Sequence, residues 1–72
     1  MSFVNKLALL EECRARIKAI HESALDAETA QSFIVSLLGT LDAAYYHALG
    51  TRDESAQVLA SVIDELEGEV DG

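Results

Sequence analysis

Apolar residues recur along the chain at intervals of three and four positions, a spacing typical of amphipathic helices. The sequence has no proline and is rich in alanine, leucine and glutamate, which favour helix. We predict helices over residues 3–24, 27–49 and 52–67, and an acidic frayed C-terminus over 68–72. The short joints require neighbouring helices to run antiparallel. The expected fold is all-α: a single domain over 1–72, formed by a three-helix up-down-up bundle in which a third helix packs on a helical hairpin.

Residues that commonly begin or end helices stand at the expected boundaries. Ser2 and Asp26 are predicted N-caps, because a short polar side chain can accept a hydrogen bond from a free N–H of the first turn. Gly50 is predicted to be the C′ residue that follows the second helix. Thr51 and Glu54 fit a capping box at the start of the third helix.

The second predicted helix carries the widest apolar face, as the middle helix of a bundle should. Its apolar residues project over an arc of about 160° when each residue turns the helix by about 100°. They are Ala30, Phe33, Ile34, Leu37, Leu38, Leu41, Ala44, Tyr45, Ala48 and Leu49. A chain this short hides only about 60% of its unfolded surface. We therefore expect a second molecule to cover part of this helix.

A strip of small residues lies behind this arc, and such residues let another backbone approach closely. Within the strip we predict a homodimer interface formed by Ser32, Ser36, Gly39, Thr40 and Ala43. Charges are sparse in this helix, as they are at interface centres. The alternative interpretation is a hydrated face of modest polarity. A hairpin dimer that exchanges its third helix is the main architectural variant.

Charge is unevenly distributed along the chain, which has 13 acidic residues, 5 basic residues and a net charge of −8. The segment 64–71 contains acids and no base. It could be a solubilising tail, could pair with Arg14 and Lys18 of the first helix, or could attract a basic partner protein. Direct binding to nucleic acid is not expected, because phosphate contacts require clustered bases on an exposed face.

Residues that could support chemistry are few. We predict no catalytic, cofactor-binding or metal-binding site, because Cys13, His21 and His47 lack the spacing of a ligand set. Cys13 falls on the apolar stripe of the first helix, where a thiol behaves as a small hydrophobe. His21 lies beside that stripe, either with its ring in water or buried against an acid such as Asp42. Ser36 lacks the preceding aspartate of an acyl-carrier attachment site.

The longest apolar runs are far shorter than the roughly 20 residues needed to span a membrane. Residues 1–10 lack the long apolar segment and cleavage site of an export signal. With a lone cysteine, these features predict a cytoplasmic protein without membrane contact.

The sequence therefore predicts a small, acidic, non-catalytic regulator, inhibitor or adaptor that binds a basic protein and occludes its working surface. The predicted partner-binding residues combine an aromatic anchor with charge: Tyr46, His47, Asp64, Glu67 and Asp71. Small acidic chains without chemistry are common among bacteriophage and mobile-element inhibitors. The alternative function is a structural or self-assembly subunit of a larger complex.

Overall fold

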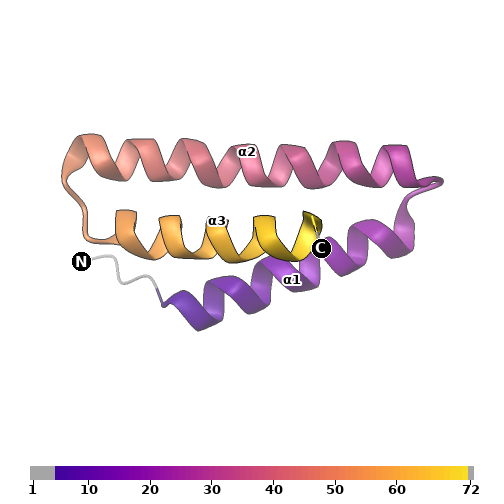
Figure 1. The fold of residues 1–72 in the computed structure, drawn as a ribbon, viewed down its shortest axis with the longest axis horizontal. Coiled ribbons are helices and arrows are strands. Elements are labelled where there is room, and N and C mark those ends of the chain that lie inside the picture. The colour runs from indigo at the N-terminus through magenta and orange to yellow at the C-terminus, as the bar shows by residue number, and fades with distance from the viewer. Residues whose placement is uncertain (1–4, 72) are drawn as a thin grey trace.

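The computed structural model of the protein describes residues 5–71, which form three helices joined by short turns (Figure 1). The helices are α1 (Lys6–Ser23), α2 (Ala27–Thr51) and α3 (Ser55–Asp71). No strand occurs within this range, so the all-helical prediction is confirmed. The predicted start of the first helix at residue 3, and Ser2 as its cap, lie outside the described residues.

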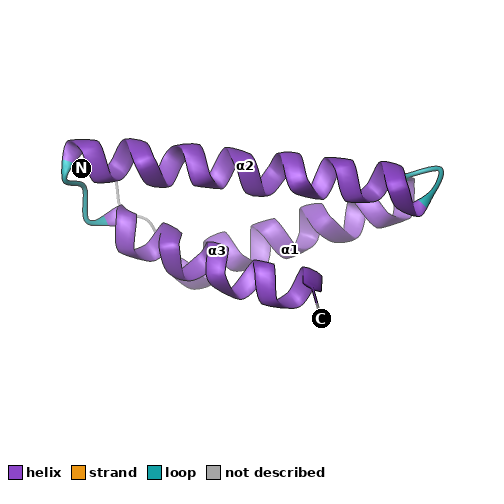
Figure 2. Ribbon diagram, turned by 45° about the horizontal axis from the view of Figure 1, so that its top comes forward, coloured by secondary structure: helices purple, strands orange, loops and turns teal. Residues whose placement is uncertain are grey.

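The helices are arranged with α1 and α3 running in one direction and α2 in the other (Figures 1 and 2). The α2–α3 contact is the most extensive of the three pairs. α2 is the longest helix and reaches beyond the C-terminal end of α3, as Figure 1 shows. α1 approaches α2 toward the joint that connects them. The expected up-down-up arrangement is therefore the observed one.

Polar side chains begin the first two helices. The Asn5 side chain accepts a hydrogen bond from the Ala8 backbone N–H at 3.1 Å. The Asp26 side chain does the same for the Thr29 N–H at 2.7 Å, as predicted. Both hydrogen bonds satisfy donors that have no partner within the helix. The bonds from Thr29 also lower the pKa of the Asp26 carboxyl.

The joint between α2 and α3 differs from the prediction at both ends. α2 continues through Gly50 to Thr51, and Arg52 is the C-cap residue, in the left-handed region with φ 57°. The predicted capping box is also wrong, because Thr51 is still helical and donates its hydroxyl to the His47 carbonyl. Asp53 accepts a hydrogen bond from the Ser55 N–H at 2.9 Å and so holds the first turn of α3.

Arg52→Gly is expected to stabilise the protein by about 1 kcal/mol, because the left-handed conformation costs a side-chain-bearing residue about that much relative to glycine. Arg52 makes no ion pair among the described residues that the change would remove. Urea unfolding followed by circular dichroism measures the difference. Arg52→Ala keeps the Cβ and should show no comparable gain. A lower stability for the glycine variant would contradict this account.

α3 is longer than predicted at its C-terminal end. The sequence suggested an end near residue 67 and fraying from residue 68, whereas α3 continues to Asp71. Two ion pairs to α1 hold its last turns, from Glu65 and from Glu69. These contacts offset the unfavourable position of acids at a helix C-terminus.

The core lies mainly along α3, although α2 carries the widest apolar face in the sequence. The buried cluster consists of Leu10, Cys13, Leu41, Ala48, Ala56, Leu59, Val62, Ile63 and Leu66. In α2 only Ala30, Ile34, Leu41 and Ala48 are buried, at spacings of four and seven that define a narrow seam. Phe33 and Leu49 belong to the predicted apolar arc, yet they are 58% and 48% exposed. α1 and α3 therefore cover only part of the apolar arc that the sequence predicts for α2.

Candidate protein-binding surface

α2 presents an uncovered face that is rich in apolar residues and poor in charge. Phe33, Val35 and Tyr46 are 58%, 56% and 69% exposed. Glu28 and Asp42 are the only charged residues between Asp26 and Arg52 in the sequence. Such a surface resembles the centre of a protein interface more than an ordinary solvated helix face.

The small-residue strip lies on this same face. All five predicted dimer-interface residues are exposed in the single chain: Ser32, Ser36, Gly39, Thr40 and Ala43. A Cβ added at Gly39 would meet no atom within 4 Å. At about 100° per residue, the strip runs between Phe33 on one side and Val35 and Tyr46 on the other. The strip is therefore flanked by larger apolar side chains, and nothing in the described part of the chain covers it.

A groove of about 210 Å³ lies beside this face, between α2 and α3. Its walls are Tyr45, Tyr46, Ala60 and Ile63, and its charged residues are Asp42, Asp64 and Glu67. The structure thus brings together three of the predicted partner-binding residues, Tyr46, Asp64 and Glu67. Asp42 was missed as a member of this group. The sequence feature that could have identified Asp42 is that it is the single charged residue in the middle of α2.

The other two predicted contact residues are placed differently. His47 is exposed but does not line the groove, because consecutive helical residues point about 100° apart. Asp71 is the last residue of α3, and its side chain lies outside the described part.

The two tyrosines of the groove differ in burial. Tyr45 is half-buried and packs against the core, whereas Tyr46 is exposed. Their ring centroids are 5.3 Å apart and the ring planes are inclined by 60°. Tyr45 therefore supports one side of the Tyr46 ring, and the other ring atoms of Tyr46 stay available to a partner.

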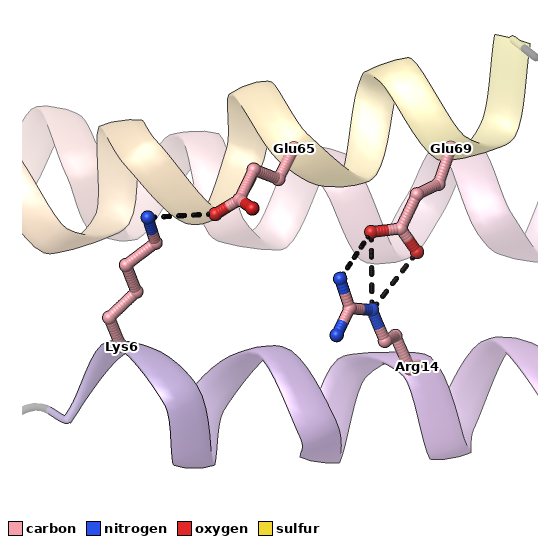
Figure 3. A network of polar contacts seen from close by, with 4 residues as sticks. All are labelled: Lys6, Arg14, Glu65 and Glu69. Carbon is pink, nitrogen blue, oxygen red and sulfur yellow. Dashed lines mark hydrogen bonds and ion pairs between the residues drawn. The ribbon is translucent and has the colours of Figure 1, made fainter.

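Ion pairs to α1 engage the acids on one side of α3 (Figure 3). Lys6 Nζ lies 2.9 Å from Glu65, and Arg14 contacts both carboxylate oxygens of Glu69 through three hydrogen bonds of 2.7–3.1 Å. The hydrogen bonds raise the pKa of Arg14 and lower that of Glu69. Arg14 was an expected partner of the acidic segment. The second partner is Lys6, and Lys18 forms no ion pair among residues 5–71.

Asp64 and Glu67 lie on the side of α3 that faces α2, and no described base pairs with either. The bundle therefore neutralises part of the acidic segment internally and leaves another part beside the groove. Pairing with α1 was one of the alternatives for this segment, and among its described side chains it accounts for Glu65 and Glu69.

A second hollow of about 460 Å³ opens where α3 ends, over the buried Ile34. Charges of both signs surround it, from Arg14, Lys18, Glu22 and Glu69, and His21 stands at its edge. His21 is exposed, so its ring is in water and the alternative of a buried pair with Asp42 is not observed. Because its charges nearly cancel, this hollow selects less strongly for one kind of partner than the groove does.

The described residues that could support chemistry are dispersed. Cys13 is 3% exposed, and burial raises the pKa of its thiol, which disfavours the reactive thiolate. Within the described range no three His, Cys, Asp or Glu side chains gather closely enough to hold a metal ion.

No family model, curated protein or solved structure matches this chain. None of the three helices over residues 5–71 has the length and apolarity required to traverse a bilayer.

Proposed function

We propose that this protein is a small, acidic, non-catalytic regulator, inhibitor or adaptor that binds a basic protein in the cytoplasm and occludes part of its surface. The observation that carries the proposal is the uncovered face of α2, with Phe33, Val35 and Tyr46 exposed beside an acidic groove. The apolar side chains supply buried area, and the carboxylates steer a basic partner and favour it over acidic ones.

The size of the chain is compatible with such a role. Its accessible surface is 5237 Å². A standard interface removes about 800 Å² from each partner. One long helix and its flanking groove can provide that area and leave most of the bundle hydrated.

We further propose that two copies associate through the strip of Ser32, Ser36, Gly39, Thr40 and Ala43. The support is that these residues are small, exposed and free of charge, so two α2 helices could approach closely. Charge opposes the association in general, since each copy carries −8. The strip, however, has no acid of its own. Analytical ultracentrifugation at tens of micromolar should detect a dimer, and a clean monomer would remove this part of the proposal.

Affinity capture from the native host tests the main proposal. The tagged protein should retain one stoichiometric basic partner, and binding should weaken as salt rises. Tyr46→Ala should lower the affinity by tenfold or more, as expected for an exposed aromatic anchor. Leu7→Ala is the control, because Leu7 is 62% exposed, belongs to α1 and does not line the groove.

A charge-matched pair of variants separates the groove from net charge. Asp64→Asn with Glu67→Gln should weaken capture, whereas Glu11→Gln with Glu22→Gln removes the same charge from exposed positions on α1 and should have little effect. Equal effects of the two double variants would show that the groove has no specific part in binding.

The alternative is a subunit that functions only within a larger assembly, and the exposed apolar face of α2 also favours this role. A regulator should be folded and monodisperse alone. A chain that aggregates or unfolds when separated from its complex would favour the assembly subunit.

A further inference from the structure

We propose that the groove between α2 and α3 receives one arginine side chain of a basic partner, with the guanidinium stacked on Tyr46 and hydrogen-bonded to the carboxylates around it. This inference rests on the proposed function for the existence of a basic partner. It adds the identity of the group that is recognised and the place where it binds.

The charges at the groove are all of one sign. Asp42, Asp64 and Glu67 line it, and no described lysine, arginine or histidine does. Three of the four cations of α1, Lys6, Arg14 and Arg16, form ion pairs with Glu65, Glu69 and Glu12. The fourth, Lys18, lines the separate hollow over Ile34. The groove therefore complements a cation that comes from another molecule.

The groove is open and small, which suits the side chain of a partner better than a buried ligand. Its volume of about 210 Å³ is smaller than the roughly 300–1,000 Å³ of small-molecule sites. Ala60 and Ile63 supply apolar wall beside the two tyrosines, against which the aliphatic stem of a long side chain can pack. A single side chain with an apolar stem and a cationic head fits both the walls and the charges.

The aromatic wall favours arginine over lysine. A guanidinium is planar, stacks on aromatic rings and binds carboxylates through two parallel hydrogen bonds. An ammonium is more strongly hydrated and has no planar face to stack. The exposed ring of Tyr46 lies beside carboxylates from two helices, so stacking and charge pairing can act on one guanidinium.

Three short peptides, titrated into the 72-residue chain, test this assignment. They are acetyl-Gly-Gly-X-Gly-Gly-amide with arginine, lysine or the neutral isostere citrulline at X, titrated into ¹⁵N-labelled protein. The arginine peptide should shift the amide signals of residues 42–46 and 60–67 with millimolar affinity, should bind at least threefold more tightly than the lysine peptide, and should lose binding at high salt. The citrulline peptide should produce no saturable shift.

Variants of the groove complete the test. Tyr46→Leu keeps an apolar side chain and should remove the preference for arginine over lysine, whereas Asp64→Asn with Glu67→Gln should abolish saturable binding of both peptides. Glu11→Gln with Glu22→Gln should leave binding unchanged. The amide spectrum of each variant reports at the same time whether it is folded.

Equal affinity for the arginine and lysine peptides, shifts scattered over the acidic surface, or shifts around the hollow at Ile34 would each overturn the assignment. Capture of a basic partner that depends on Tyr46, without any arginine preference in these titrations, would overturn the assignment and leave the proposed function standing. If no partner is captured but the arginine preference is intact, the assignment of the groove stands and the proposed function is overturned.

Discussion

Leu66→Ala is expected to lower the free energy of unfolding by about 2–5 kcal/mol, the range for removing a buried leucine side chain from a well-packed core. Leu66 is 0% exposed and belongs to the cluster to which all three helices contribute. A chain of 72 residues has a total stability of about 4–11 kcal/mol. The substitution therefore removes a large part of that stability and should shift the unfolding midpoint to a clearly lower urea concentration.

Urea unfolding followed by circular dichroism measures this loss, and Leu25→Ala is the matched control. Leu25 is 97% exposed in the joint between α1 and α2, so the same chemical change should alter stability by less than about 0.5 kcal/mol. Similar losses at the two positions would mean that α3 is not the centre of the core. Because a dimer would add stability, both variants are compared at one protein concentration.

The periodicity of apolar residues was sufficient to predict three helices, because helix formation is local and each stripe repeats over several turns. Asp26 was predictable as a cap for the same reason: its carboxylate needs only the free N–H of Thr29, three positions away. The α2–α3 joint was less predictable. Gly50 is the usual choice for a left-handed position, but α2 continues past it, and Arg52 occupies that conformation without a glycine.

The width of the covered face on α2 could not be predicted from its own sequence. Phe33 and Ile34 are neighbours in the same apolar arc, yet Phe33 is 58% exposed and Ile34 is 1% exposed. The difference depends on where α1 and α3 lie against α2, which is decided by contacts between residues far apart in the chain. The same limit explains why Lys6, and not Lys18, pairs with an acid of α3.

The sequence identified most residues of the candidate groove one by one, but it did not show that they lie next to one another. Tyr46 stood out as an aromatic residue outside the apolar arc, and Asp64 and Glu67 as members of an acidic segment. Their meeting depends on the register of α3 against α2, which also adds Asp42. Ion pairing with α1 then separates Glu65 and Glu69 from this group. The acidic segment therefore contains two sets of acids with different surroundings, which its sequence does not distinguish.

The uncovered face of α2 and the groove adjoin along Tyr46, so self-association and partner binding must be separated by a residue that belongs to one of them only. Gly39 meets this requirement, because it lies on the strip and does not line the groove. It has room for a methyl group in the single chain, where a Cβ would meet no atom within 4 Å. Any penalty for a larger residue at this position must then come from a second molecule.

Gly39→Ala is expected to weaken the proposed dimer by about fivefold or more, because an added methyl group in a closely packed contact costs about 1–3 kcal/mol. Gly68→Ala is the matched control: Gly68 is also helical and also opens onto free space, but it lies on α3. Each alanine should stabilise its own helix by up to about 1 kcal/mol. Sedimentation equilibrium then separates the two effects, since only the Gly39 variant should shift toward monomer.

The arginine peptide should bind the Gly39→Ala variant as it binds the unaltered protein, because the groove keeps all of its lining residues. If the Gly39→Ala variant is more stable and equally dimeric, the two copies make contact elsewhere on the surface. Loss of peptide binding together with the dimer would instead mean that the groove is completed by the second copy, so that Tyr46 is positioned across the interface and not by α2 and α3 alone.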